Sequence, residues 1–256
     1  MITGRLVTAA LLAVLLAGCS GVPQRELPPT PDPIEKVNRG INTFNLAVDR
    51  WTLRPIAKGY TKITPRPIRI AISNLFDNLA EPVNIINNLL QGKFAKSGAE
   101  VARFLLNTTA GVGGLVDIAS HAGLEEHEED FGQTLAVWGL PSGPFVMVPF
   151  LGPYTLRDGF EFLDGPTNLL YWIDDRDLRV WMLALYFVDM RTQFLDVDKA
   201  LTESLDPYIF LRESYLQNRT YEIYDGNPPL EEFPEDEWED EEQPPQAEKD
   251  EAGSAQ

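Results

Sequence analysis

The chain has 256 residues, a formal net charge of −18 and a single cysteine. This length is enough to bury a core without disulfides, and one large domain is the simplest organisation. The acidic composition argues against nucleic-acid binding, which needs a basic surface, and the lone cysteine excludes structural metal sites built from several thiolates.

The N-terminus reads as a secretory signal. Arg5 precedes an apolar run from Leu6 to Leu16, and small residues then lead to Cys19. The run is shorter than the roughly 20 apolar residues that a bilayer-spanning helix needs. The letters LAGC, ending at Cys19, resemble the lipobox of bacterial lipoproteins; a chance cysteine in an ordinary signal is the alternative. The lipobox implies a signal peptide over 1–18, covalent diacylglyceryl and N-acyl groups on Cys19, and, with Ser20 in place of aspartate, export to the outer membrane.

Two segments flank the predicted folded body, which we place at 33–226. A proline-rich stretch over 19–32 predicts an extended tether that carries the lipid anchor. The C-terminal segment 227–256 holds twelve carboxylates and one lysine, and its few apolar residues predict disorder. This acidic tail is either a solubilising segment or an arm that docks a basic partner.

The body predicts helices separated by proline and glycine, and no segment alternates as a strand does. The first apolar stripe at helical spacing consists of Ile68, Ile72, Leu75 and Leu79. Pro82 suits a first helical turn, so a second helix is predicted from there to a C-cap at Gly92. Ser97 and Glu100 have the spacing of a capping box before a further helix, and the last long helix is predicted over 177–201.

A glycine- and proline-rich segment over 139–166 is unusually apolar for a loop. Loops in water are normally polar, because their backbone groups need hydrogen-bond partners. We therefore expect this segment to lie in the core, or against lipid or another protein. Its large apolar residues are Phe145, Val146, Met147, Val148, Phe150 and Leu151.

Catalytic and metal motifs are absent from the sequence. It contains no G-x-S-x-G, no H-E-x-x-H and no P-loop lysine motif. The two histidines, His121 and His127, have poor ligand spacing, and a solvated loop is the favoured interpretation. Arg157 and Asp158 are predicted to form a structural ion pair. We expect neither an enzyme nor a bound metal or other cofactor.

Five stretches, in order along the chain, resemble the MlaA family, also called VacJ lipoproteins. The resemblance covers about 32–224, and the tail lies outside it. The stretches are DPIEKVNRGINTFN at 32–45, NLAEPVNIINNLLQGK at 78–93, ARFLLNTTAGVGGLVDIA at 102–119, DFGQTLAVWGLPSGPFVMVPFLGPYTLRD at 130–158 and SLDPYIFLRESYLQNR at 204–219.

The resemblance implies an all-α fold, a ring of amphipathic helices embedded in a membrane around a central channel. It implies a lipoprotein on the periplasmic face of the outer membrane, within the inner leaflet. Its role would be to remove misplaced phospholipids from the outer leaflet and to maintain lipid asymmetry. The implied partners are phospholipids as cargo, a trimeric porin and an MlaC-like periplasmic carrier. A structural porin-binding lipoprotein without transport is the competing class; a phospholipase is weaker, because no nucleophile and base are evident.

Candidate residues for a lipid path or gate follow from these motifs. Gly139 and Gly143 are candidate hinges for the apolar loop, and Asn42, Phe44 and Asn45 belong to the opening motif. The remaining candidates are Phe145, Val146, Met147, Val148, Phe150 and Leu151. The asparagines between 84 and 88 either face a pore or belong to an ordinary amphipathic helix, and the sequence leaves both readings open.

Overall fold

The computed structural model describes residues 28–229, and it is predominantly helical, as the sequence predicts. The α-helices are α2 (Glu35–Val48), α3 (Arg54–Ile63), α4 (Arg66–Leu90), α5 (Phe94–Thr109), α6 (Ile118–His121), α7 (Phe131–Val137), α8 (Arg176–Gln193), α9 (Asp198–Glu203) and α10 (Pro207–Ile223). A π-helical turn, η1 (Asp49–Leu53), joins α2 to α3. The 3-10 helices are η2 (Asp158–Thr167), η3 (Leu169–Trp172) and η4 (Leu195–Val197).

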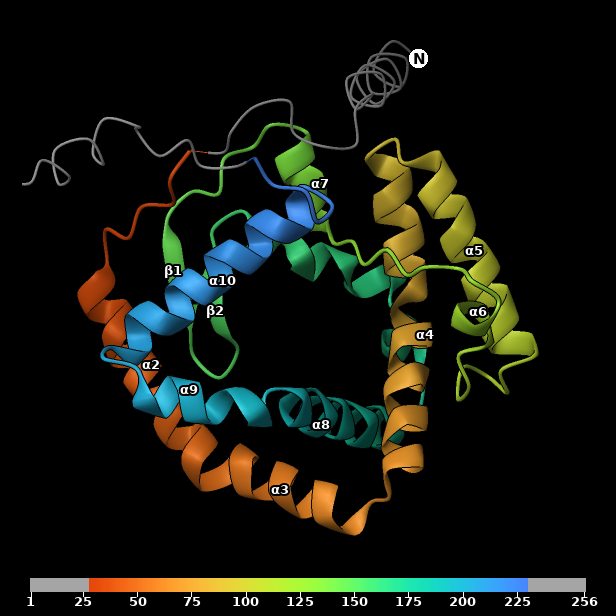
Figure 1. Cartoon of the computed structure of the whole chain (residues 1–256), viewed down its shortest axis with the longest axis horizontal. Coiled ribbons are helices and arrows are strands. Elements are labelled where there is room, and N and C mark those ends of the chain that lie inside the picture. Colours follow the sequence, from red (N-terminus) through yellow and green to blue (C-terminus); the bar gives the residue numbers. More distant parts are fainter. Residues whose placement is uncertain (1–27, 230–256) are drawn as a thin grey trace, which may run out of the picture.

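The elements are arranged in a ring (Figure 1). In this view α2 lies at the left, α3 at the bottom and α4 at the right. Elements α7, η2 and α10 close the ring. Helix α8 packs against both α3 and α4, whereas α5 and α6 lie on the side of α4 away from the middle. No helix within 28–229 is both long enough and apolar enough to cross a membrane.

Helix α4 is longer than expected. The predicted break at Pro82 is wrong, because α4 continues through it from Arg66 to Leu90. An interior proline removes one backbone hydrogen bond at a cost of about 3 kcal/mol. Packing of α4 on α5, α7, α8, η2 and η3 offsets this cost. The predicted end is confirmed, since Gly92 follows the helix with a φ of 78°.

Two other boundaries differ from the sequence prediction. Helix α5 begins at Phe94, so Ser97 and Glu100 lie inside it, and they do not form a capping box. The helix predicted over 177–201 is divided into α8, η4 and α9. At this break Arg191 binds Asp49 at 2.7 Å and Asp198 at 2.6 Å, which ties the end of α8 to η1.

The apolar glycine- and proline-rich segment contains a β-hairpin, which the sequence analysis missed. Strand β1 (Phe145–Val148) pairs antiparallel with β2 (Gly152–Thr155), with Phe145 opposite Thr155 and Val148 opposite Gly152. The alternation in β1 is hidden because all four of its residues are apolar, although only Phe145 and Met147 are buried. In Figure 1 the hairpin lies within the outline of the ring.

The end of the predicted tether belongs to the folded body. Pro31 accepts a hydrogen bond from the Phe145 amide at 2.8 Å, and Thr30 accepts one from Arg212 at 3.0 Å. Asp32 accepts hydrogen bonds from Asn38 and Tyr208. The body thus begins at about Thr30, three residues earlier than expected. The signal peptide, Cys19, most of the tether and nearly all of the acidic tail lie outside the described residues.

Candidate functional site

Two asparagines of α2 bind the backbone of the hairpin. Asn38 donates to the Phe145 carbonyl at 3.1 Å and accepts from the Met147 amide at 2.9 Å. Asn45 donates to the Val148 carbonyl at 2.9 Å and accepts from the Phe150 amide at 2.8 Å. A side-chain amide carries the same donor and acceptor as a peptide group. The two residues are seven positions apart and share a helix face, so α2 serves β1 as a third strand would.

The structure therefore brings the opening motif and the apolar loop together. Asn42 is buried between the two binding asparagines. The Phe44 ring meets the Phe150 ring edge-on, with centroids 5.2 Å apart. Both rings remain accessible, since Phe44 is 45% exposed and Phe150 is 67% exposed. Leu151, also exposed, completes the apolar tip, which we define as Phe44, Phe150 and Leu151.

The other candidate residues of the loop are the four residues of β1, which are less exposed than the tip. Phe145 and Met147 are buried in a cluster with Tyr208, so they belong to the core and do not line a surface. Val146 and Val148 point to the opposite face of the strand and are half-buried. The candidates thus divide into a buried base and an exposed tip.

The candidate hinges occupy backbone conformations that favour glycine. Gly139 has a φ of 91° and Gly143 a φ of 68°, a region that residues with a Cβ rarely adopt. A Cβ added at Gly143 would also lie 3.1 Å from the Cβ of Leu156. Glycine is therefore required here by the shape of the turn, whether or not the turn moves.

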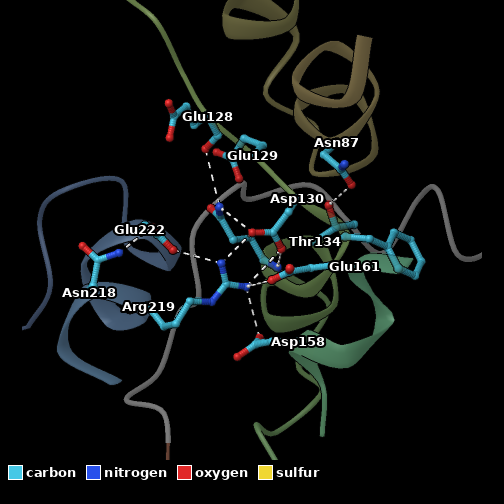
Figure 2. A network of polar contacts seen from close by, with 12 residues as sticks. Asn87, Glu128, Glu129, Asp130, Thr134, Asp158, Glu161, Asn218, Arg219 and Glu222 are labelled. Carbon is cyan, nitrogen blue, oxygen red and sulfur yellow. Dashed lines mark hydrogen bonds and ion pairs between the residues drawn. The ribbon is translucent and has the colours of Figure 1, made fainter. Parts of the chain in front are cut away.

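A buried arginine of α10, Arg219, binds carboxylates at the start of α7 and in η2 (Figure 2). Arg219 makes a two-pronged contact with Asp130, at 2.5 and 3.0 Å, and donates to Asp158 at 3.1 Å and to Glu222 at 2.9 Å. Asp130 is also the N-cap of α7. The arginine approaches so closely that a Cβ at Gly132 would lie 2.8 Å from its Nη2.

The carboxylates of this cluster differ in pKa. Burial acts to raise the pKa of Asp158, but Arg219 and Arg157 outweigh it and lower the pKa to about 2. Burial and the nearby Asp130 raise the pKa of Glu161 to about 8. The predicted ion pair between Arg157 and Asp158 is confirmed at 2.9 Å. The cluster fixes three elements, α7, η2 and α10, around one guanidinium.

Helices α4 and α5 pack through polar side chains. The buried residues of this polar seam are Asn78 and Glu81 on α4 and Ser97, Glu100 and Arg103 on α5. Arg103 lies 3.3 Å from Glu81 and 3.5 Å from Glu100. Burial and the neighbouring Glu100 raise the pKa of Glu81 to about 8. The seam is thus a low-dielectric polar interior between two helices.

The asparagines of α4 match neither interpretation offered by the sequence. Asn87 donates to Asp164 at 2.9 Å, Asn88 donates to the His127 carbonyl at 3.1 Å, and Asn84 accepts from the Glu129 amide at 3.1 Å. They bind other elements of the fold and do not face a pore. The loop between the two histidines is exposed for most of its length, as predicted, and His121, Glu125 and Glu126 are accessible. Its end packs against the fold, because Glu129 is buried and His127 binds Glu100 at 2.7 Å.

A small polar pocket of about 60 Å³ lies beside the seam. Its lining residues are Asn74, Asp77, Asn78, Glu81, Arg103, Asn107, Asp117 and Glu126. It is polar and much smaller than a phospholipid tail, so it is not a lipid site. Within the described residues, no group of histidines and carboxylates is arranged to hold a metal ion.

Large apolar side chains are exposed on four helices, and three of these, α4, α5 and α8, also bury polar side chains. On α3, α4, α5 and α8 the exposed ones are Ile56, Ile63, Ile68, Ile70, Ile86, Leu89, Phe94, Val101, Leu105, Leu178, Val180, Trp181, Tyr186, Phe187 and Met190. On α5 the exposed Phe94, Val101 and Leu105 lie at i, i+7 and i+11, opposite the seam. A set of exposed apolar side chains of this size is typical of a surface that contacts lipid or another protein.

Sequence reasoning missed two residues that organise the site. Asn38 lies four and seven residues before Asn42 and Asn45, and this recurrence of asparagine on one helix face could have indicated a bound backbone. Arg219 shares a buried face of α10 with Tyr208 and Ile223. An arginine at a buried position of such a face could have indicated a buried carboxylate partner.

Known proteins resemble this chain over most of its length. Residues 30–222 match the family model described as "MlaA lipoprotein". The "Intermembrane phospholipid transport system lipoprotein MlaA" of Escherichia coli K12 is 38% identical over 226 residues, which cover 85% of this chain and 88% of that protein. Its namesake in Haemophilus influenzae is 32% identical over 88% of this chain and 93% of its own length.

A solved structure has the same fold. It is described as "Structural basis for maintenance of bacterial outer membrane lipid asymmetry", and it superimposes with a TM-score of 0.68 and 36% sequence identity. The match covers 75% of this chain and 98% of that one. Together with the family match and the two relatives, this agreement identifies the chain as a member of the MlaA lipoprotein family.

Proposed function

We propose that this protein is an outer-membrane lipoprotein that removes misplaced phospholipids from the outer leaflet and so maintains lipid asymmetry. In this proposal Cys19 carries the lipid anchor, the ring lies in the inner leaflet, and lipids leave through the ring towards a periplasmic carrier. The names of the relatives, which refer to intermembrane phospholipid transport and to outer-membrane lipid asymmetry, support this role.

Helices α4 and α5 bury polar side chains and expose large apolar ones, and this observation carries the membrane placement. Their contact is polar, through Glu81, Glu100 and Arg103, and their outer faces carry large apolar side chains such as Ile86 and Val101. In water this arrangement exposes apolar surface at a cost of about 25 cal/mol per Å². Against hydrocarbon the cost disappears, and polar contacts between helices become a means of association. Helices that do not cross the bilayer can still lie in one leaflet.

A phospholipid needs an apolar route out of the membrane. Pulling both acyl chains into water exposes roughly 30 methylenes, at a cost on the order of 25 kcal/mol. Phe150 and Leu151 of the tip belong to the hairpin, which lies within the outline of the ring (Figure 1), and Phe44 of α2 packs against Phe150. We propose that this tip contacts the acyl chains as lipid passes through the middle of the ring. The buried residues below it, Phe145 and Met147, would keep it in place.

The finer parts of the proposal rest on the family resemblance. They are the inner-leaflet position, a trimeric porin as the neighbour in the membrane, and an MlaC-like carrier as the acceptor. The protein is a transport component in this proposal and performs no bond-making step. A porin-binding scaffold without transport is the competing function, and it would use the same apolar surface only for contact.

A transfer assay separates the two functions. The lipidated mature chain is reconstituted into vesicles that contain a fluorescent phospholipid, and the MlaC-like carrier is added outside. We expect the chain to accelerate transfer of the label to the carrier over protein-free vesicles. The double variant Phe150→Ser/Leu151→Ser should lose most of this acceleration, whereas Leu205→Ser, an exposed residue outside the hairpin, should retain it. Equal transfer with and without the chain would favour the scaffold.

A further inference from the structure

Helix α3 lies at the bottom of the ring in the view of Figure 1, and cationic residues recur along η1 and α3. Residues 50–70 contain six lysines and arginines and no carboxylate, in a chain whose net charge is −18. Four of the six, Arg50, Arg54, Lys58 and Lys62, recur at every fourth position, and Arg66 and Arg69 follow at the start of α4. Within α3, residues four apart are neighbours, so Arg54, Lys58 and Lys62 form a row on its surface. Arg50 lies in the preceding π-helical turn, and Arg66 begins the next helix.

The buried face of α3 fixes which way the row points. Ala57 is fully buried, and the Tyr60 hydroxyl donates to Asp189 of α8 at 3.2 Å. A helix turns by about 100° per residue, so Lys58 and Ile56 project from opposite flanks of this anchored face. Lys62 and Ile63 repeat the division one turn later. Helix α3 thus has one basic flank and one apolar flank, and this separation is sharper than in the other long helices of the described residues.

Most of these cations have no ionic partner within residues 28–229. Arg54 contacts Asp49 at 3.2 Å and Asp198 at 3.3 Å, so it serves the fold. Arg50, Lys58, Lys62 and Arg66 are exposed, and no described carboxylate forms an ion pair with them. These four residues are the basic stripe. Surface cations in an acidic protein normally find acidic neighbours, so a stripe without them is available to an external anion.

We infer that the basic stripe binds the phosphate groups of anionic phospholipids, such as phosphatidylglycerol, at the boundary between headgroups and acyl chains. Helix α3 would lie in the plane of the membrane, with Ile56 and Ile63 towards the acyl chains and Lys58 and Lys62 at the phosphates. Long basic side chains at this boundary extend their charge to the headgroups while their stems stay in apolar surroundings. This inference rests on the membrane placement in the proposed function and is independent of transport.

The apolar neighbours of the stripe distinguish a lipid surface from a purely ionic partner. Trp51 is 81% exposed and Ile63 is 80% exposed, beside Arg50 and Lys62. A polyanion in water would gain nothing from these side chains. A membrane interface accommodates both, because tryptophan is favoured at the headgroup level and aliphatic side chains favour the layer below it. Charge and apolarity therefore indicate the same occupant.

Vesicle flotation of the full mature chain tests the inference, with Cys19→Ala so that the anchor does not mask binding by the body. Vesicles of neutral phosphatidylcholine are compared with vesicles that include phosphatidylglycerol. The test variant is Lys58→Gln/Lys62→Gln. The matched control is Lys36→Gln/Arg176→Gln, which removes two exposed charges elsewhere. Far-UV circular dichroism verifies that each variant is folded.

We expect the parent protein to bind anionic vesicles more tightly than neutral ones. The Lys58→Gln/Lys62→Gln variant should bind anionic vesicles about 10- to 30-fold more weakly than the parent, since each cation near an anionic surface contributes on the order of 1 kcal/mol. Binding to neutral vesicles should change little, and salt should abolish the preference for anionic ones. Equal weakening in the control variant, or no preference for anionic vesicles in the parent, would overturn the inference. Failure of the parent to bind either vesicle would instead contradict the membrane placement in the proposed function.

Discussion

Asn45 and Phe150, which are 105 residues apart in the chain, are joined by a hydrogen bond from the Phe150 amide to the Asn45 side chain at 2.8 Å. The same side chain donates to the Val148 carbonyl at 2.9 Å. A helix side chain thus binds the backbone of the turn that presents Phe150 and Leu151. The position of the tip depends on α2 as much as on the hairpin itself.

The first prediction concerns this contact. Asn45→Ala removes both hydrogen bonds and should lower the free energy of unfolding by about 1–2 kcal/mol, since each is partly accessible to water. Hydrogen exchange of the Phe150 amide should accelerate more than that of amides in α10. Thr43→Ala is the control, because the Thr43 hydroxyl binds only a carbonyl of its own helix. Unchanged exchange at Phe150 would show that Asn45 does not hold the turn.

The second prediction concerns Gly143, whose φ of 68° is unfavourable for other residues. Gly143→Ala should lower stability by about 1–2 kcal/mol, the usual cost of a left-handed residue with a Cβ. Gly159→Ala is the control, because a Cβ there meets nothing within 4 Å and its φ is not positive. Thermal unfolding of both variants in detergent measures the difference. A neutral Gly143→Ala would mean that the turn relaxes freely.

The same geometry decides which variant can test whether Gly139 and Gly143 act as hinges. Proline at Gly139 or Gly143 forces φ to about −65°, and at Gly139 it also removes the amide that donates to Ala136 at 2.8 Å. Such a variant should reduce protein abundance as well as lipid clearance. It therefore cannot separate gating from folding, and the alanine variant is the more informative one.

The third prediction concerns Arg219. Arg219→Met leaves Asp130 and Asp158 buried without their main partner, and should destabilise the fold by about 3–5 kcal/mol. Arg219→Lys should recover only part of this loss, because an ammonium cannot make the two-pronged contact with Asp130. Arg176→Met, at an exposed arginine, is the control. Denaturant titration gives the three values, and a stable Arg219→Met protein would contradict the assigned role.

The fourth prediction is a pH dependence caused by Glu81. Its folded-state pKa is raised by burial to about 8, so the folded chain holds a proton that the unfolded chain releases above about 4.5. The stabilising contribution is complete at low pH and is lost as pH rises through 8, because stability falls wherever the folded state binds more protons. Unfolding at pH 5, 7 and 8.5 should therefore show a shallower decline for Glu81→Gln than for the parent. The control Glu203→Gln, at an exposed carboxylate, should follow the parent.

Local patterns were sufficient to predict much of the helical architecture. The apolar stripe of α4 and the glycine after it predicted a helix ending near Gly92, and this is confirmed. The break predicted at Pro82 is wrong, because packing against five other elements offsets the hydrogen bond that the proline removes from α4. The capping box at Ser97 failed for a related reason, since the Ser97 hydroxyl donates to the Ile85 carbonyl of α4 at 2.9 Å.

The interior contacts could not be predicted, because they depend on tertiary pairing. Asn84, Asn87 and Asn88 read as the polar face of an amphipathic helix, yet they are buried against segments about 40 to 80 residues away. The hairpin was hidden because an entirely apolar strand has no alternation to detect. The resemblance to the family located the relevant segments, but not the division into a buried base and an exposed tip.

The most direct test of the central claim is the amount of phospholipid in the outer leaflet of a strain that lacks this protein. The account predicts that deletion raises surface phospholipid, that the wild-type chain restores the normal level, and that Cys19→Ala, expressed at the same abundance, does not. An unchanged level of surface phospholipid after deletion would contradict the account, and the porin-binding scaffold would then be the better explanation.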